Sequence, residues 1–334
     1  MTPVSTGAAD PAGPRTGDRV RSVGDRLQQL LAGAGLLVVF AFFAIADPNF
    51  LNYGNVTNIL FSTVVIGTLA LGTTAVVVTG GIDLSLGTGM ALCAVVAGVL
   101  ITGSGLPVVV GVLGAILFGG LIGLVNGLNV TLLGLPPFIA TLAMMMVASG
   151  LALVLSGSAP IYIDAPGYTA ISTGSALPGS GFPNAVLVLA VVAVLAAVLL
   201  NRTVLGRYAY AIGSNEAATA LSGIDVRRSK VLIYTIGGLF TGLAGVLISA
   251  RLGSAQPGTG TGYELQAIAA VVIGGTSLSG GRGSVVGTLI GALIISVLNN
   301  GLQIMSIPQE WQNVILGVVI VLAVYADQAR RRRS

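Results

Sequence analysis

The side chains in this chain that could do chemistry are mainly hydroxyls and carboxamides, with a few carboxylates. The sequence has no histidine and one cysteine, Cys93, and its single lysine is Lys230. Without histidine there is no imidazole for acid–base catalysis, and one cysteine cannot build a thiolate metal cluster. No G-x-x-x-x-G-K-[ST] sequence is present, so the chain carries no P-loop for ATP. We therefore expect no catalytic residue, no metal site and no cofactor held by the chain itself.

Ionisable groups are scarce in the apolar parts of the sequence. Ion-coupled transporters usually keep such groups at mid-membrane depth. We find none in the interiors of the apolar runs, and the nearest candidate is Asp83, at the glycine-rich end of one run. This pattern disfavours a self-contained ion-coupled transporter. If transport is uphill, its energy must come from another subunit.

The elements that position these residues are membrane helices. Hydrophobic residues make up 54% of the chain and charged residues 8%, whereas a soluble domain has roughly 25% charged residues. A helical span needs about 20 apolar residues, and about ten such runs are centred near residues 38, 70, 94, 117, 146, 192, 240, 270, 295 and 318. The runs are continuous rather than alternating, which excludes a β-barrel. The fold class is therefore an all-α polytopic membrane protein with about ten transmembrane helices.

The basic residues predict the orientation of these helices. With the N-terminus in the cytoplasm and ten spans, 14 of the 15 basic residues fall on the cytoplasmic side and Arg251 falls outside. Cytoplasmic loops carry such an excess of Lys and Arg, so both termini are expected to be cytoplasmic. The terminal run from Arg330 to Arg333 then acts as a topology anchor, and we expect no nucleic-acid partner.

The chain divides into one membrane domain and two tails. Residues 1–27 are polar and rich in Pro, Gly and Arg, which predicts a disordered cytoplasmic tail. Residues 28–329 form the transmembrane domain, and residues 330–334 form a basic cytoplasmic tail. The domain has two longer connections, an outer loop over 157–183 and a cytoplasmic loop over 201–229.

The cytoplasmic loop contains the main hydrophilic interruption, residues 211–224, with five basic residues around it. Ser214 or Asn215 can cap a short helix there, and Glu216 would lie favourably near its positive end. Alanines favour helix in the next turn, and Gly223 suits its C-terminal stop. The pattern predicts a short rigid helix parallel to the membrane, which could transmit a push or a pull. A solvated connecting loop is the alternative.

An eleven-residue segment occurs twice. Residues 77–87 (VVTGGIDLSLG) and 271–281 (VVIGGTSLSGG) share seven identities. Non-helical backbone at membrane depth is tolerated where it is buried in protein or lines a cavity. Each copy is either a re-entrant element beside a translocation path or a tight turn; the two readings are even for 80–87, and the turn is favoured for 274–281. Glycines four residues apart, at 119/123/127, 238/242 and 287/291, predict close helix packing.

From about residue 48 to 330 the chain resembles the inner-membrane permease subunits of bacterial ABC importers for sugars, the ribose and monosaccharide permease family. The resemblance rests on short pieces in a fixed order: DPNF (47–50), GGIDLSLG (80–87), NG (126–127), PPFIATL (136–142), GRYAYAIGSNEAA (206–218), SGI (222–224), GGTSLSGGRGS (274–284) and NG (300–301). Each piece is weak alone, and their order and spacing make the match specific.

The resemblance implies a multi-pass protein of the bacterial inner (plasma) membrane with a type II, vitamin B12 importer-like permease fold. It also implies a second permease subunit, in a homodimer or heterodimer, two cytoplasmic ATPase domains that bind the ATP, and a periplasmic or lipoprotein substrate-binding protein. The 211–224 segment looks like the element that docks into the ATPase. Its expected coupling residues are Gly213, Asn215, Glu216, Ala217, Ala218, Ser222, Gly223 and Ile224.

A sugar path needs hydrogen-bonding groups with little net charge. The candidates in or near spans are Asp83, Ser85, Asn126, Asn129, Thr141, Asn299, Asn300 and Gln303. Each could instead make a structural hydrogen bond between helices, and Asp83 could cap a half-helix or pair with Arg282. The substrate class also has alternatives, namely nucleosides, autoinducer-type furanoses and branched-chain amino acids. A self-contained secondary transporter is the less favoured alternative.

Overall fold

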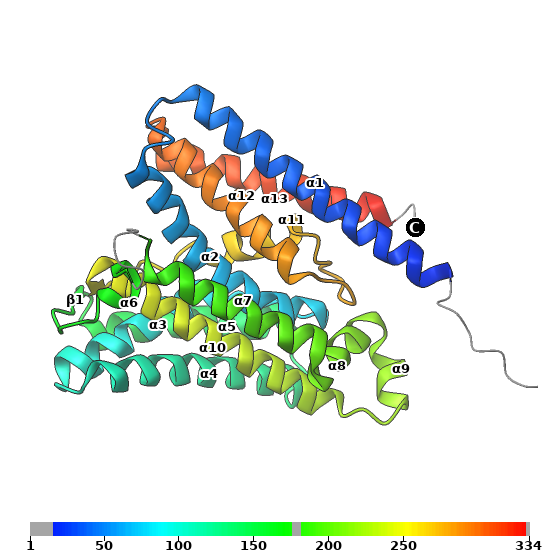
Figure 1. Ribbon diagram of the computed structural model, residues 1–334. Coiled ribbons are helices and arrows are strands. Elements are labelled where there is room, and N and C mark those ends of the chain that lie inside the picture. Colours follow the sequence, from blue (N-terminus) through cyan, green and yellow to red (C-terminus); the bar gives the residue numbers. More distant parts are fainter. Residues whose placement is uncertain (1–15, 176–181, 332–334) are drawn as a thin grey trace, which may run out of the picture.

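A computed structural model describes residues 16–175 and 182–331, which are almost entirely helical (Figure 1). The elements in chain order are α1 (Thr16–Ala46), α2 (Tyr53–Val78), α3 (Leu86–Gly98), the π-helical turn η1 (Val99–Gly103), α4 (Val108–Thr131), α5 (Pro137–Ser156), β1 (Ile161–Tyr162), α6 (Ala170–Thr173), α7 (Asn184–Arg202), α8 (Val204–Ser214), α9 (Glu216–Leu221), α10 (Val226–Leu252), β2 (Ser254–Ala255), α11 (Tyr263–Ile273), α12 (Val285–Ile304) and α13 (Gln309–Arg331).

Each of the ten apolar runs forms a helix, which bears out the all-α polytopic prediction. Within the described residues, seven helices are long and apolar enough to cross a membrane: α2, α3 with η1, α4, α5, α7, α10 and α12. The other three runs give shorter apolar stretches, Leu30–Ala46, Tyr263–Ile273 and Gln309–Tyr325. At 1.5 Å per residue, α11 covers only about 16 Å of a hydrocarbon core about 30 Å thick. A count of ten crossings therefore stays a prediction.

The tails were predicted over residues 1–27 and 330–334. Residues 1–15 and 332–334 lie outside the described residues, while α1 takes in 16–27 as helix and α13 extends to Arg331. The boundaries of the membrane domain at 28 and 329 stay predictions.

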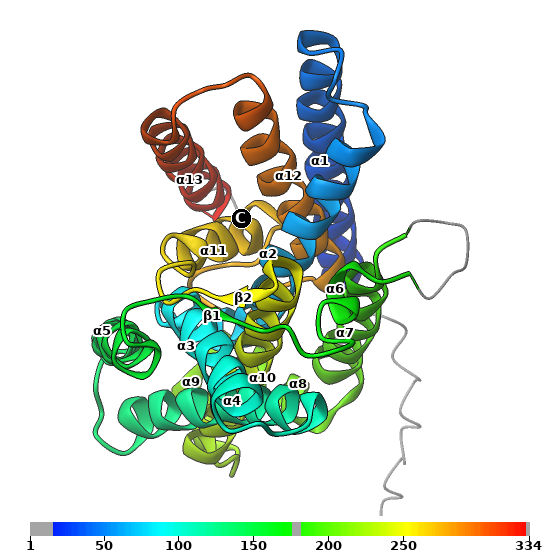
Figure 2. The same cartoon turned by 90° about the vertical axis from the view of Figure 1, so that its left-hand side faces the viewer.

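Helix α10 lies at the centre of the bundle and packs against α4, α2 and α3. On one side α5 packs on α3 and α4, on the other α7 packs on α2, and α1 and α13 lie against α12 and α11 (Figure 2). The α4–α10 contact is made through glycine. A methyl group at Gly119 would lie 2.7 Å from Cα of Gly242, and one at Gly123 would lie 3.1 Å from Cα of Gly238. The predicted close packing through 119/123/127 and 238/242 is therefore confirmed.

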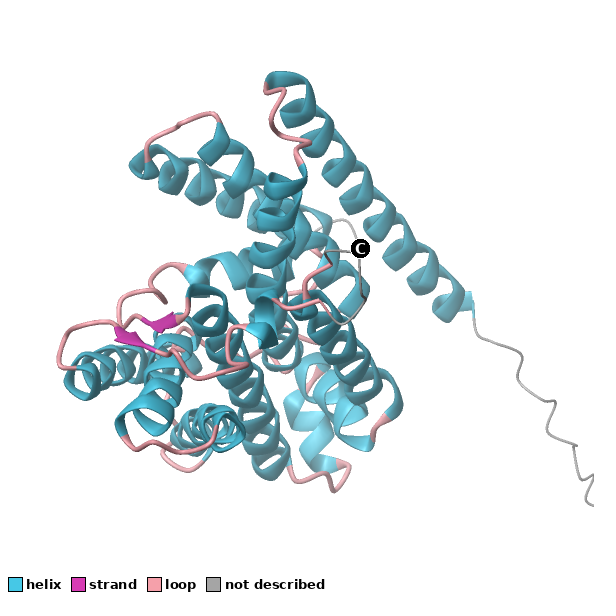
Figure 3. Cartoon of the chain, turned by 60° about the vertical axis from the view of Figure 1, so that its left-hand side comes forward, coloured by secondary structure: helices cyan, strands magenta, loops and turns pink. Residues whose placement is uncertain are grey.

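The outer loop folds back on the end of α10. β1 and β2 pair antiparallel, with Ile161 opposite Ala255 (Figure 3). Tyr168 is fully buried there, and its hydroxyl lies 2.6 Å from Oγ of Ser249. Burial raises the pKa of Tyr168 to about 12, against the opposing effect of that hydrogen bond. Residues 176–181 of the predicted loop lie outside the described residues.

The two ends of the bundle differ. The start of α1, the C-terminal end of α13 and the α8–α9 segment lie at one end, whereas β1 and α6 lie at the other (Figure 1). Large apolar side chains such as Val154 and Leu117 are exposed along the sides of the bundle. Apolar sides with polar ends are the surface expected of a protein whose solvent is lipid.

Candidate functional site

The hydrophilic segment forms a short capped helix, as the sequence predicts. Asn215, rather than Ser214, caps it: its Oδ1 accepts the backbone N–H of Ala218 at 3.0 Å. Glu216 begins α9, and the helix ends at Leu221 with Ser222 Oγ donating to the carbonyl of Ala218 at 2.9 Å. Gly223 follows with φ +82°, a left-handed conformation that glycine adopts at low cost. The local structure expected over 214–223 is therefore present.

An ion pair fixes α9 to the start of α10. Nζ of Lys230 lies 2.7 Å from Oε2 of Glu216, whose side chain is 56% exposed. An exposed pair of this kind contributes about 0.2–1 kcal/mol. Asp225 caps α10 by accepting the N–H of Arg228 at 2.9 Å. Both α9 and α10 therefore begin with a side-chain cap.

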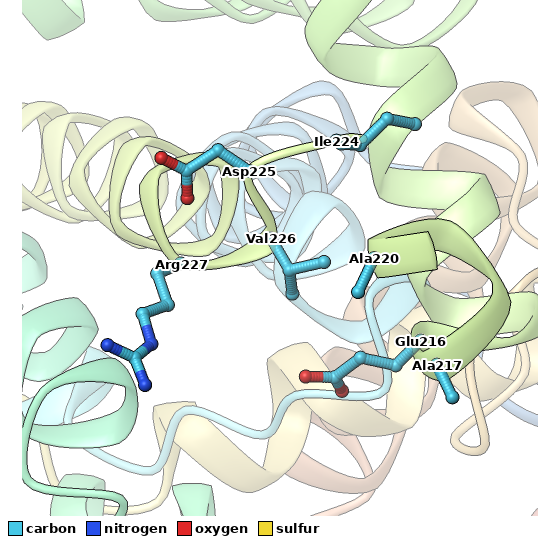
Figure 4. Close-up of a pocket in the computed structure, with 7 residues that line it drawn as sticks. All are labelled: Glu216, Ala217, Ala220, Ile224, Asp225, Val226 and Arg227. Atoms are coloured by element: carbon cyan, nitrogen blue, oxygen red, sulfur yellow. The ribbon is translucent and has the colours of Figure 1, made fainter. Parts of the chain in front are cut away.

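A pocket of about 610 Å³ opens beside α9 (Figure 4). Ala220 and Val226 face each other across it, and the charged ends of Glu216 and Arg227 lie on its rim (Figure 4). Its other lining residues are Ala217, Ile224 and Asp225. Leu221, at the end of α9, is 90% exposed. This end of the bundle therefore presents a small apolar surface rimmed by charges, a common composition of sites for protein partners.

The first glycine-rich copy is a buried non-helical connection. α2 ends at Val78, Gly80 has φ +78°, and α3 begins only at Leu86. Between them Asp83 is 3% exposed, and the carbonyl oxygen of Ile82 accepts hydroxyls from Tyr234 at 3.3 Å and Thr141 at 3.4 Å. Non-helical backbone of this kind must be satisfied by neighbouring protein. The helices on both sides, α2 and α3 with η1, are long and apolar enough to cross a membrane, so both readings of 80–87, a re-entrant element and a tight turn between two spans, stay predictions.

The second copy turns between α11 and α12. Gly275 has φ +94°, and the N–H of Thr276 bonds back to the carbonyl of Val271 at 3.0 Å. A methyl group on Gly287 or Gly291 would overlap the backbone of Gly274 or Ala270. The predicted close packing at 287/291 is therefore present, and it seats the first turns of α12 on α11.

Four of the predicted path residues meet in one buried cluster. Oδ1 of Asp83 accepts the N–H of Ser85 at 2.8 Å and its hydroxyl at 2.6 Å. The carboxamide of Asn126 on α4 donates to Oγ of Ser85 at 2.9 Å, and Thr141 on α5 reaches the neighbouring Ile82 carbonyl. Among the described residues the only ion pair joins Lys230 and Glu216, so Asp83 does not pair with Arg282. The alternative in which Asp83 caps the start of α3 is closer to what the structure shows.

The other predicted path residues lie elsewhere. Asn129 is half-buried one turn along α4 from Asn126, outside the hydrogen bonds of the cluster. Asn299, Asn300 and Gln303 lie at the far end of α12, where Nδ2 of Asn300 donates to Oδ1 of Asn55 at 2.8 Å. The candidate set is thus split between two places rather than joined in one site.

Comparison with known proteins agrees with this architecture. The family model described as "Branched-chain amino acid transport system / permease component" matches residues 55–324. The chain belongs to this family of transport permeases. It is similar to the ribose import permease protein RbsC of Escherichia coli K12, with 44% identity covering 89% of this chain and 92% of the relative. It is also similar to RbsC of Bacillus subtilis (46% identity, 91% and 94% covered) and to the xylose transport system permease protein XylH of Haemophilus influenzae (33%, 92% and 98%). No solved structure is significantly similar to the permease.

The resemblance stated from the sequence is therefore confirmed at the level of the family. The chain is an ABC permease subunit and a multi-pass protein of the inner membrane. The coupling and path residues are not assigned by these matches, and they stay predictions.

Sequence reasoning missed one ionisable residue in the permease. Glu264 lies in the first turn of α11, at the start of the run centred near residue 270, and it was not among the predicted site residues. Its Oε1 accepts the N–H of Gly262 at 3.1 Å, and its Oε2 is buried without a hydrogen-bond partner among the described residues. A methyl group on Gly87 would overlap both this carboxylate and the carbonyl of Gly260. The sequence does show a carboxylate here, in GTGYELQA (260–267). It is easily overlooked when residues near 270 are taken as one continuous apolar span.

Proposed function

We propose that the permease is the membrane subunit of an ATP-driven importer for a monosaccharide or a related polyol. The observation that carries this proposal is the identity with ribose import permeases over about nine-tenths of both chains. In the proposed complex two permease subunits pair and two ATPase domains bind the α9 end, which is cytoplasmic. An exported binding protein delivers substrate at the β1–β2 end, and the subunit fold is of the type II kind.

The geometry supports the proposed coupling role of 213–224. α9 is held in place by the Asn215 cap and by Lys230, and its outer face is exposed. A rigid, exposed helix transmits displacement, whereas an unstructured loop would absorb it. Closure of the ATPase dimer on ATP binding would then displace α8 and α9 and reorient the two permease subunits.

The cluster of Asp83, Ser85, Asn126 and Thr141 is the proposed inner part of the translocation path. Its hydroxyl and carboxamide groups suit hydroxyl-rich solutes, because they donate and accept hydrogen bonds without adding charge. The family description also names branched-chain amino acids, which makes them the second candidate substrate class. An amino acid carries an ammonium and a carboxylate, and this cluster offers a single carboxyl group and no cation within its hydrogen bonds.

Purification of the tagged permease from native membranes in mild detergent tests the assembly. We expect a P-loop ATPase and an exported binding protein to co-purify, and the isolated binding protein to bind ribose or another monosaccharide and not leucine. Binding of leucine would move the substrate to the amino-acid class. A permease that purifies alone and transports sugar without an ATPase would contradict the proposal.

The coupling role has its own test in the variant Glu216→Arg with Gly223→Pro. This change breaks the ion pair to Lys230, and proline cannot adopt the positive φ of residue 223. We expect substrate-stimulated ATP hydrolysis to be lost while membrane insertion is unchanged. Glu216→Gln alone removes the ion pair but keeps the Asn215 cap and Gly223, so it should lose less of the stimulation than the double variant.

A further inference from the structure

The last turn of α8 lies directly on the meeting point of the two glycine-rich copies. The N–H of Gly281, in the second copy, donates to the carbonyl of Val78, at the start of the first, at 2.9 Å. A methyl group at Gly213 would overlap that carbonyl oxygen and would lie 2.5 Å from the nitrogen of Gly281. The hydrogen bond between the copies is therefore compatible with α8 only if residue 213 has no side chain.

The three backbones are packed without side chains between them. A methyl group at Gly280 would lie 2.8 Å from Cα of Gly213 and 2.8 Å from the nitrogen of Gly80. A second link joins the same elements, because the hydroxyl of Tyr210 on α8 donates to the carbonyl of Gly283 at 3.0 Å. Close-packed backbone has little room to compress, so a movement of α8 cannot be absorbed at this point.

Each of the three backbones leads to a different part of the permease. From Gly213 the chain continues through Asn215 into α9. From Val78 it continues to Ile82, whose carbonyl accepts hydrogen bonds from α5 and α10, and to Ser85, whose hydroxyl accepts one from Asn126 on α4. From Gly281 it continues to Ser284, which caps α12 by accepting the N–H of Gly287 at 3.2 Å.

We propose that Gly213 is a positioning residue that locks the α8–α9 segment to both glycine-rich copies, so that one displacement moves the α2–α3 and α11–α12 connections together. This inference rests on the proposed coupling function. It adds that the repeated sequence has a mechanical role: both copies provide bare backbone for the same contact. Neither the family match nor the relatives assign a role to this contact.

The variant Gly213→Ala tests the lock in the complete complex, reconstituted with its ATPase and binding protein. Gly150→Ala on α5 is the matched control, because it is also a helical glycine and a methyl group there would meet no atom within 4 Å. We expect stimulation of Gly213→Ala by the loaded binding protein to fall at least tenfold, with transport reduced equally. The control should behave as the unmodified complex.

Thiol labelling gives a readout that a purely structural role would not change. Cys93 is buried, so single exposed cysteines at Arg207→Cys on α8 and Ser279→Cys in the second copy can be followed. In the complex that keeps the native Gly213, ATP binding should change the labelling rates at both residue 207 and residue 279. In Gly213→Ala, the rate at 207 should still change and the rate at 279 should not.

Two results would overturn the lock. One is full stimulation in Gly213→Ala. The other is a complex with the native Gly213 in which ATP binding changes the labelling rate at residue 207 and leaves the rate at residue 279 unchanged. This second result would overturn the lock even if Gly213→Ala fails to assemble. Failure of the coupling function itself would look different, because the unmodified complex would then show no stimulated ATP hydrolysis.

Discussion

Asp83 is held by hydrogen bonds rather than by an opposite charge. Its Oδ1 accepts both the amide and the hydroxyl of Ser85, and Asn126 closes the cluster from α4. A buried carboxyl group is costly unless its hydrogen-bond partners are in place. The arrangement favours a residue that shapes the 79–85 connection over one that exchanges a coupling ion.

This assignment predicts opposite results for two substitutions of Asp83. Asp83→Asn keeps an oxygen that can accept from Ser85, so ATP-driven transport should stay within a few-fold of the unmodified level and should not depend on an ion gradient. Asp83→Ala leaves two buried donors unpaired, which costs about 1–3 kcal/mol for each. Its thermal unfolding temperature in detergent should fall, and its transport should fall with it. A selective loss of ion dependence in Asp83→Asn would instead support the secondary transporter.

At the scale of the element, α9 has one face buried against the bundle and one face exposed. Thr219 is buried against the bundle, whereas Leu221 is 90% exposed. An exposed leucine beside an apolar pocket adds nothing to the stability of the isolated permease, but it can be buried by a partner. The sequence directed attention to the polar residues of this segment and overlooked Leu221.

Leu221→Asp should therefore weaken ATPase binding without weakening the permease. We expect the amount of ATPase that co-purifies per permease to fall about tenfold or more, since burying a leucine contributes about 1.5–3 kcal/mol and an unpaired charge costs more. The unfolding temperature of the permease alone should not change. Leu221→Met, which keeps the apolar volume, should retain binding, and equal co-purification from all three forms would remove Leu221 from the interface.

At the scale of the whole molecule, the two ends of the bundle should face opposite sides of the membrane. The N-terminal end of α1 and the C-terminal end of α13 lie at the same end of the bundle as α8 and α9, and β1 lies at the opposite end (Figure 1). This agrees with the charge asymmetry of the sequence, which assigns the α8–α9 end to the cytoplasm. The orientation and the count of ten crossings stay predictions, and the count requires α11 to cross the membrane together with its preceding loop.

Labelling with a membrane-impermeant maleimide checks the orientation. Tyr162→Cys, at a side chain that is 67% exposed on β1, should react in cells whose outer envelope alone is permeable. Arg207→Cys on α8 should react only after the inner membrane is opened. The reverse labelling pattern would show that the permease has the opposite orientation, with α9 outside the cytoplasm, where a cytoplasmic ATPase could not bind it.

The sequence by itself determined the helical class, the positions of the ten apolar runs as helices, the capped helix at 216–221 and the close packing of α4 on α10. These depend on local composition and on small residues at helical spacing, both of which are legible along the chain. It did not separate the cluster around Asp83 from Asn299, Asn300 and Gln303, because each is simply a polar residue near a span.

Only the tertiary structure decided which of these residues meet. Val78, Gly213 and Gly281 are far apart in the sequence, and nothing in their type shows that they share one contact. Likewise α11 begins only at Tyr263, after Gly262 with φ +89°, and the packed fold places Glu264 beside Gly87. Local helix propensity and hydropathy do not indicate which distant backbone segments will touch. Contacts between the backbones of distant glycines are therefore visible only in the packed fold.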